Sequence, residues 1–133
     1  MSDITHVHPV VVADSQCRAL CSCGGQHPAP GVTLYAAADA ATVLAADYRA
    51  LHAQRELLLL SDPLTHAVVG ARVCAALLEA GIAVDHRLLD DEPSATEELA
   101  ERVRARALGK ALIIAVGAGT VNDLAKYAAD RNA

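Results

Sequence analysis

The chain has 133 residues, enough for one domain, and its 53% of hydrophobic residues exclude an intrinsically disordered protein. Aromatic residues make up 2% and the net charge is −5, so the chain lacks both the stacking rings and the basic surface of a nucleic-acid-binding protein. No stretch approaches about 18 uninterrupted apolar residues and the N-terminus lacks the basic start of a signal peptide, so we expect a cytoplasmic protein that does not contact membranes.

The first 30 residues differ from the rest of the chain. They contain three of the four cysteines, three of the six histidines and two turn signals, Gly24-Gly25 and Pro28–Pro30. We expect an irregular segment with at most one short strand, around Val10–Val12. Four of its side chains have the composition of a tetrahedral zinc site, although small buried thiols beside a Gly-Gly turn are the favoured interpretation. They are Cys17, Cys21, Cys23 and His27.

From Gly31 onward, strands and helices are expected to alternate. A strand at 32–35 precedes a helix that runs from Asp39 to about Gln54, with one apolar stripe. The unbroken apolar run Leu57–Leu60 predicts a strand buried on both faces. Asp62 is then the expected N-cap of a helix that begins at Pro63 and ends before Gly81. The first helix has its stripe at Leu44, Tyr48 and Leu51, and the second at Leu64, Ala67, Val68, Ala71, Ala75 and Leu78.

The second half of the chain repeats this alternation. A strand is expected at 82–88. The next helix begins with a capping box at Ser94–Glu97 and is expected to bury Leu99, Val103 and Ala107. A fully buried strand at 112–116 leads through a glycine loop into the last helix. The order βαβαβαβα predicts an α/β fold over residues 31–133, in which a Rossmann-like, mostly parallel sheet carries helices on both faces. The inward side of the last helix comprises Val121, Leu124, Ala125 and Ala128.

Two strand ends carry groups that suit a ligand. In open α/β sheets, ligands bind at the carboxyl ends of the strands, where the strand order reverses. The loop Gly117–Thr120 offers backbone N–H groups at a helix N-terminus, which suits a phosphate. The carboxylate of Asp62 can accept hydrogen bonds from ribose hydroxyls. Together these features predict the two halves of a dinucleotide site.

Each of these residues also has a structural interpretation. The glycines could serve only to turn the chain, and Asp62 could serve only as an N-cap. Thr120 and Asp123 fit a capping box, and Asp123 with Lys126 fits a solvated ion pair. Four further side chains are expected to have no role beyond packing or surface exposure: His52, His66, His86 and Cys74.

Three segments resemble one enzyme family. The run Gly117–Ala129 resembles the glycine-loop signature of the sn-glycerol-1-phosphate dehydrogenases, whose relatives are glycerol dehydrogenase, iron-containing alcohol dehydrogenase and dehydroquinate synthase. Their common pattern is Gly-x-Gly-Ser/Thr, two residues, Asp, two residues and Lys. Leu58–Thr65 is similar to the family's first nucleotide-binding turn, a hydrophobic strand followed by Asp-x-x-Thr. Cys21–His27 is more loosely similar to a Cys-x-Cys-Gly segment of some bacterial members.

The resemblance implies roles for individual residues. Asp62 would face the adenosine ribose, where an acid favours NAD over NADP because it repels a 2′-phosphate. Asp123 would contact the cofactor and, with Lys126, lie toward the nicotinamide and the substrate. The implied reaction is the reduction of dihydroxyacetone phosphate by NADH or NADPH while a metal ion polarises the carbonyl oxygen. The pyrophosphate would be held by Gly117, Ala118, Gly119 and Thr120.

The chain departs from this family in length. Members carry a second, helical domain that supplies an Asp and two His to the catalytic zinc or iron, whereas this chain ends at Ala133. We therefore expect a nucleotide-binding part that is inactive alone and pairs with a complementing C-terminal subunit or with itself. The helix face of Val121, Leu124 and Ala128 is expected to be partly bare. The alternatives are a non-catalytic nucleotide-binding remnant or split subunit, and a relative of the dehydroquinate synthase or glycerol dehydrogenase type.

Overall fold

The computed structural model describes residues 10–11, 33–34 and 38–130, and the chain divides into two units, residues 1–40 and 41–133. In the first unit, β1 (Val10–Val11) pairs antiparallel with β2 (Thr33–Leu34). The strand expected at 32–35 therefore pairs with β1 and does not extend the parallel sheet. The candidate zinc ligands lie outside the described residues: Cys17, Cys21, Cys23 and His27.

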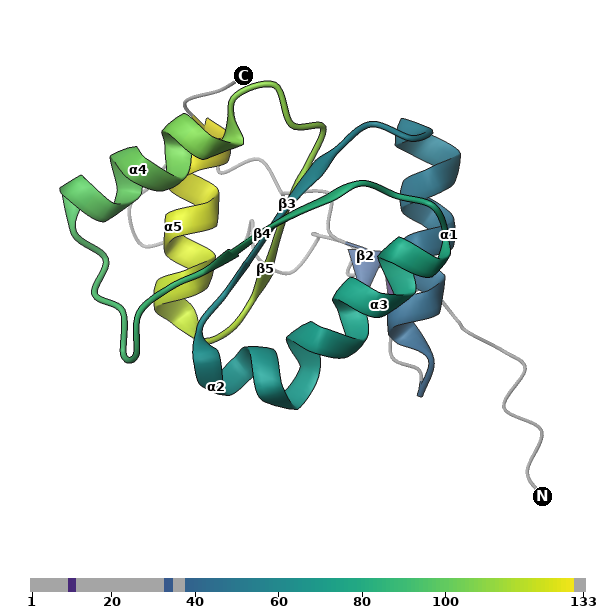
Figure 1. Ribbon diagram of the computed structural model, residues 1–133, viewed down its shortest axis with the longest axis horizontal. Helices are drawn as coiled ribbons and strands as arrows, with labels where there is room; N and C mark the ends of the chain where they lie inside the picture. The colour runs from purple at the N-terminus through teal and green to yellow at the C-terminus, as the bar shows by residue number, and fades with distance from the viewer. Residues whose placement is uncertain (1–9, 12–32, 35–37, 131–133) are drawn as a thin grey trace, which may run out of the picture. The chain divides into compact units, whose positions relative to one another are not determined.

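The second unit is built on a three-stranded parallel sheet in the order β4-β3-β5 (Figure 1). The central strand β3 (Leu57–Ser61) pairs with β4 (Val84–Leu88) on one side and with β5 (Ile113–Val116) on the other. The connection from β3 to β4 and the connection from β4 to β5 pass over opposite faces of the sheet, so helices flank it on both sides. The predicted α/β class with a parallel sheet is confirmed.

The central strand fills both layers of the core. Leu57 and Leu59 pack with α1 (Ala40–His52) and α3 (Ala71–Glu79) on one face of the sheet. Leu58 and Leu60 pack with α4 (Glu97–Ala107) and α5 (Gly119–Asp130) on the other face. All four leucines are completely buried, which confirms a strand buried on both faces.

The helical segment after β3 contains a turn that the sequence pattern does not reveal. It consists of α2 (Pro63–Thr65), the π-helical turn η2 (His66–Gly70) and α3. A π-helical turn bonds residue i to i+5, so it rotates the rest of the helix relative to a regular spacing of three and four. The buried residues are Gly70, Val73 and Leu77, which lie on a different face from the predicted stripe. The predicted stripe is wrong, because Leu64, Ala67, Val68, Ala71, Ala75 and Leu78 are all exposed.

Three further expectations about individual residues are wrong. Leu51 is 78% exposed, because His52, not Leu51, follows Tyr48 on the inner face of α1 and contacts its ring at 4.9 Å between centroids. The N-cap of α4 is Thr96, not Ser94; its hydroxyl accepts from the backbone N–H of Leu99 at 3.2 Å. The strand β5 is half-buried because it lies at an edge of the described sheet.

The inner face of α5 is covered, contrary to the expectation of a partly bare surface. Val121, Leu124 and Ala128 are at most 2% exposed, because α5 packs against both α4 and the sheet. The hydroxyl of Tyr127 on α5 donates to the carboxylate of Glu101 on α4 at 2.8 Å. This helix pair therefore closes its own apolar face without a further domain.

Charged side chains join the strands near their amino ends. Lys110 forms ion pairs with Glu56 and, at 3.1 Å, with Asp85 on β4. Arg106 donates to both oxygens of the Asp85 carboxylate, at 2.6 Å from Nη2 and 3.1 Å from Nε. The hydrogen bonds from Arg106 are the main reason that the pKa of Asp85 lies below its usual value. Since Asp85 is only 14% exposed, these contacts are shielded from water on the carboxylate side.

The central strand generates a stability prediction. Leu59→Ala should lower the free energy of unfolding by about 2–5 kcal/mol, because it leaves a cavity in a completely buried site. Leu51→Ala is the matched control: the same atoms are removed at a site that is 78% exposed, so the change should stay within about 0.5 kcal/mol. Urea unfolding of both variants measures the difference, and equal effects would contradict the packing described for β3.

The Asp85 carboxylate generates a prediction about pH. A folded-state pKa below the unfolded one adds stability that is present above the unfolded pKa, about 3.9, and is lost as the pH falls toward the folded pKa. Asp85→Asn should therefore lower the free energy of unfolding by about 1 kcal/mol at pH 7 and flatten its decline below pH 4. Urea unfolding at several pH values, with Asp47→Asn on α1 as control, tests this; parallel pH profiles for wild type and Asp85→Asn would refute it.

Candidate functional site

The two loops that carry the candidate ligand groups lie side by side. Ser61 at the end of β3 is in register with Val116 at the end of β5, so Asp62 and Gly117 follow on neighbouring strands. The hydroxyl of Thr65 donates to the carbonyl of Val116 at 2.8 Å and ties the loops together. The segment that follows β3 passes over one face of the sheet, and the segment that follows β5 passes over the other. Open α/β sheets bind ligands between two such strand ends.

Asp62 opens the helical segment after β3. Its Oδ1 accepts from the backbone N–H of Thr65 at 2.8 Å, and the Thr65 hydroxyl accepts from the backbone N–H of Asp62 at 3.3 Å. The predicted N-cap with Pro63 at the first helical position is confirmed. The Thr65 N–H is the main reason that the pKa of Asp62 is lowered, so the carboxylate is charged at neutral pH. A carboxylate has room for about four hydrogen bonds, so capping leaves acceptor positions for a ligand.

The two glycines of the second loop have different constraints. A Cβ on Gly117 would lie 2.5 Å from Cγ2 of Val121, so packing requires glycine there. A Cβ on Gly119 would meet nothing within 4 Å, and Gly119 does not have a positive φ. Neither packing nor backbone conformation therefore requires a glycine at position 119. This residue begins α5, and an anion can approach the backbone at the N-terminus of a helix. The exposed backbone of the loop Gly117–Thr120, called the phosphate cradle below, therefore has room for a pyrophosphate.

The residues around Gly119 are accessible. Gly117 and Ala118 are exposed and Thr120 is half-buried. Since α5 begins at Gly119 and the N–H of Asn122 donates to the carbonyl of Ala118 at 3.3 Å, Thr120 lies inside the helix. The capping box expected for Thr120 and Asp123 is therefore wrong.

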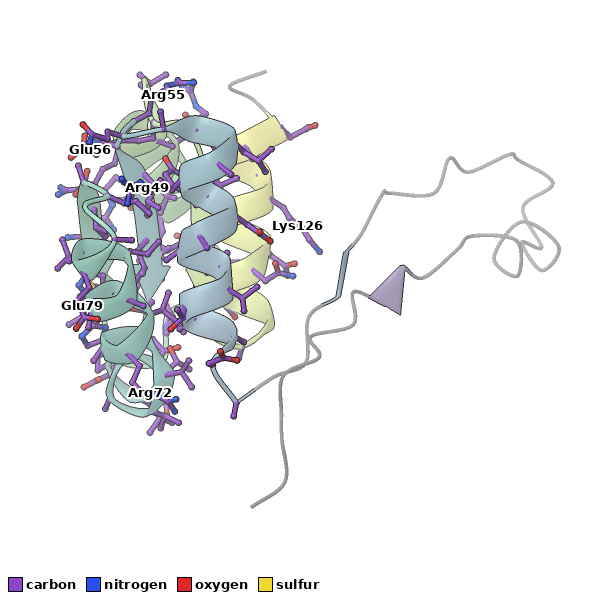
Figure 2. All side chains as sticks on the ribbon, turned by 90° about the vertical axis from the view of Figure 1, so that its right-hand side faces the viewer. Arg49, Arg55, Glu56, Arg72, Glu79 and Lys126 are labelled. Atoms are coloured by element: carbon purple, nitrogen blue, oxygen red, sulfur yellow. The ribbon has the colours of Figure 1, made fainter. Side chains whose placement is uncertain are left out.

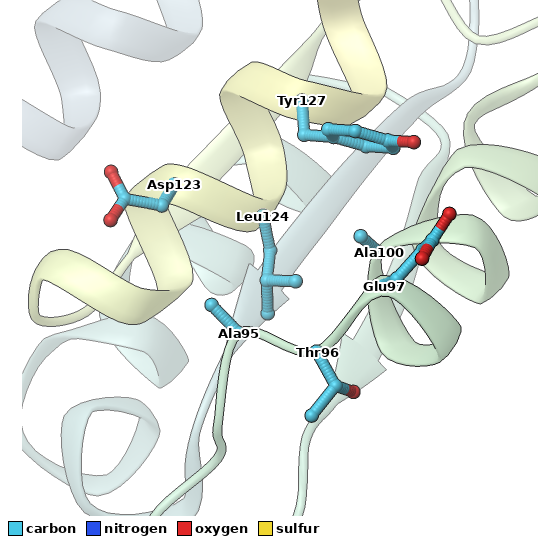
Figure 3. Close-up of a pocket in the computed structure, with 7 residues that line it drawn as sticks. All are labelled: Ala95, Thr96, Glu97, Ala100, Asp123, Leu124 and Tyr127. Carbon is cyan, nitrogen blue, oxygen red and sulfur yellow. The ribbon is translucent and has the colours of Figure 1, made fainter.

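Asp123 and Lys126 lie further along α5, and both are exposed. Asp123 borders a pocket of about 440 Å³ between α5 and the start of α4, which Thr96 and Tyr127 also line. In Figure 3 the carboxylate of Asp123 points away from Tyr127. The side chain of Lys126 projects outward from α5 in Figure 2. The structure thus places Asp123 one helical turn from Gly119 and Lys126 beyond it.

An apolar groove adjoins both loops, a feature that the sequence analysis did not anticipate. Its volume is about 640 Å³, and it lies between the η2 turn and the edge strand β5. Thr65 and Gly117 form its border with the two loops, and Leu64 and Val68 are among the exposed side chains that line it. A flat ring could occupy such a groove beside the phosphate cradle.

A cluster of polar side chains was also missed. The hydroxyl of Ser61 lies 2.8 Å from Nε2 of His86 on β4 and 3.5 Å from Nδ1 of His66 in η2. The two imidazoles stack, with 4.4 Å between centroids and 21° between planes. The expectation that both histidines lie on helix or strand surfaces is only partly right, because His66 and His86 are half-buried and contact Ser61. A serine at the end of a buried strand was the available signal, because a buried hydroxyl requires a partner.

The described residues contain no metal centre and no membrane-crossing helix. Within residues 10–11, 33–34 and 38–130, no group of three or more His, Cys, Asp or Glu side chains could hold a metal ion. No helix in these same ranges is long and apolar enough to span a bilayer. Cys74 on α3 is a free, half-buried thiol.

The strand order and the paired loops at the carboxyl edge place this chain among the doubly wound α/β domains. The family model of the iron-containing alcohol dehydrogenases matches residues 36–133, so the chain belongs to this family. The family is generally NAD(P)-dependent and uses a metal. No curated protein matches the chain.

The hydrogen bond between the loops generates a further prediction. Thr65→Val removes the hydroxyl that donates to the carbonyl of Val116 and accepts from the backbone N–H of Asp62. The free energy of unfolding should therefore fall by about 1–3 kcal/mol. Thr42→Val, the same change at an exposed position of α1, should cost no more than about 0.5 kcal/mol. Thermal and urea unfolding measure both variants. A Thr65→Val protein as stable as wild type would show that the loops are not held by this contact.

Proposed function

We propose that this chain is the dinucleotide-binding part of an alcohol-dehydrogenase-type oxidoreductase. The observation that carries the proposal is the open space at Gly119 beside the charged carboxylate of Asp62, at the carboxyl edge of a parallel sheet. The family to which the chain belongs supports it, since its members generally use NAD or NADP. The pyrophosphate would lie on the backbone of Gly117–Thr120, where the α5 dipole favours an anion.

Asp62 would select the cofactor. The hydroxyls of a ribose are donors that a charged carboxylate accepts, whereas a 2′-phosphate would be repelled by it. Because the pKa of Asp62 is lowered, this charge persists throughout the physiological range. The proposal therefore favours NAD over NADP. One ring of the dinucleotide would lie in the apolar groove that adjoins Thr65 and Gly117.

The proposed substrate is dihydroxyacetone phosphate. This choice rests on the resemblance of Gly117–Ala129 to the sn-glycerol-1-phosphate dehydrogenases. When bound, the nicotinamide would supply the hydride for the carbonyl carbon. Asp123 and Lys126, which follow Gly119 on α5, would lie toward the reacting end. A dehydroquinate synthase or glycerol dehydrogenase type of activity, or nucleotide binding without catalysis, is the alternative.

The proposal includes a protein partner that carries metal ligands. The described residues do not fit a metal ion, so a complementing C-terminal subunit or domain would contribute them. Apolar side chains beside the candidate site are exposed, among them Leu64 at 75% and Val68 at 63%. A contact with a second copy of the chain is the alternative.

Two substitutions of Asp62 distinguish a role in binding the ligand from a role in capping the helix. Asp62→Asn should leave the free energy of unfolding nearly unchanged, because Asn caps a helix about as well as Asp. The dissociation constant for NADH should rise about fivefold, since a charged acceptor is replaced by a neutral one. Asp62→Ala should in addition cost about 1 kcal/mol of stability. Calorimetric titration of NADH together with melting curves measures both effects, and unchanged affinity in folded Asp62→Asn would leave capping as its only role.

The glycine pair provides a matched test of the phosphate cradle. Gly119→Ala should preserve stability within about 0.5 kcal/mol, because its Cβ meets no protein atom, yet weaken NADH binding about tenfold by blocking the backbone. Gly117→Ala should cost about 1–3 kcal/mol of stability, because its Cβ would overlap Val121. Normal NADH affinity in Gly119→Ala would remove the pyrophosphate from this loop.

A further inference from the structure

The hydroxyl of Ser61 joins two imidazoles behind the candidate site. Ser61 is completely buried, and its Oγ lies 2.8 Å from Nε2 of His86 and 3.5 Å from Nδ1 of His66. A serine this close to a histidine resembles a nucleophile with its base, but a completely buried hydroxyl cannot reach a substrate. The hydrogen bond instead satisfies the hydroxyl inside the protein.

The two histidines hold both ends of the turn that contains Asp62. Ser61 immediately precedes Asp62, and His66 immediately follows Thr65. The backbone N–H of His66 also donates to the carbonyl of Asp62 at 2.8 Å. The ring of His66 contacts Ser61 and stacks on His86 of β4. It thus holds the residues between Ser61 and His66 against β4.

The local backbone makes room for the His66 ring. Gly70 is buried in η2, and a Cβ there would lie 2.8 Å from Nδ1 of His66. The φ of Gly70 is −58°, an ordinary helical value, so the glycine is required for space and not for conformation. Together with the π-helical turn, it allows the ring to reach Ser61.

We propose that His66 and His86 are positioning residues of the dinucleotide site, which act through Ser61 on the turn Asp62–Thr65, and that the turn is released when His86 gains a proton. This inference rests on the proposed dinucleotide function. Its consequence is that NADH affinity depends on pH in a range where Asp62 itself does not titrate. Neither ring touches the cofactor in this arrangement.

The charges around His86 set the direction of the effect. Burial lowers the pKa of His86, the charge of His66 lowers it further, and Asp85 on the same strand opposes the shift. Ser61 and the leucines of β3 add no charge to this environment. Because the folded pKa lies below the unfolded value of about 6.5, the ordered turn is fully favoured above pH 6.5 and is lost progressively as the pH falls below it.

The test follows the turn and the ligand separately in the full chain. Without ligand, the amide N–H resonance of Thr65 should shift together with the imidazole resonances of His86 as the pH falls from 8 to 5.5, since that N–H reports the Asp62 contact. With NADH, calorimetry should show a dissociation constant that is higher at pH 5.5 than at pH 8, by at most about tenfold.

Three variants decide the outcome. His86→Gln keeps an amide for the Ser61 hydroxyl but lacks the ring on which His66 stacks and cannot titrate, so NADH binding should weaken at pH 8 and lose most of its dependence on pH. Gly70→Ala should displace the His66 ring and weaken binding at pH 8. His52→Gln is the matched control, because His52 also contacts a ring, that of Tyr48, and lies on α1; it should keep the wild-type pH profile.

The two proposals fail differently. Absence of NADH binding by the wild type at pH 8 would overturn the dinucleotide function, while the Thr65 resonance would still test the positioning role. The positioning role would be overturned if the Thr65 resonance in the wild type did not shift together with the His86 resonances. It would also be overturned if folded His86→Gln showed the same pH-dependent shift of the Thr65 resonance as the wild type. Parallel NADH profiles for wild type and His86→Gln would do the same.

Discussion

The complete burial of β3 is the constraint on which the rest of this unit depends. Leu57 to Leu60 point alternately into two apolar layers and leave no place for a polar side chain along the strand. Polar groups appear only where the strand ends, at Ser61 and Asp62. Candidate chemistry is therefore confined to the carboxyl edge of the sheet, where β5 brings a glycine loop to the same level.

Local sequence signals predicted the elements that depend on local interactions. The apolar run of β3, the Asp62 cap and the inward face of α5 were read correctly, because each follows from neighbouring residues. The apolar stripe from Leu64 to Leu78 was read wrongly, because the segment turns Gly70, Val73 and Leu77 inward. Leu64 and Val68 line an exposed groove instead, so apolar character alone did not identify the buried face. The stack of His66 on His86 depends on the pairing of β3 with β4, which no spacing within either segment encodes.

The glycine loop shows how a motif mixes two physical requirements. Gly117 and Gly119 are equivalent in the pattern Gly-x-Gly, yet only Gly117 is required by a neighbouring side chain, Val121. A Cβ at Gly119 would meet no atom within 4 Å, so the surrounding side chains do not account for this glycine. A sequence pattern can therefore identify the loop, but the surrounding side chains are needed to decide which glycine is structural and which one is available to a ligand.

The two ends of the sheet are joined by different chemistry, and β4 takes part in both. Near the amino ends, Asp85 is held by Arg106 and Lys110, charged groups that keep their charges over a wide range of pH. Toward the carboxyl ends, its neighbour His86 is held by the Ser61 hydroxyl and by the stacked ring of His66, and burial lowers the pKa of His86. Successive residues of a strand face opposite sides of the sheet, so the ion pairs can keep β4 in place on one face while His86 responds to pH on the other. The fold can thus remain intact under conditions in which the turn beside the candidate site is released.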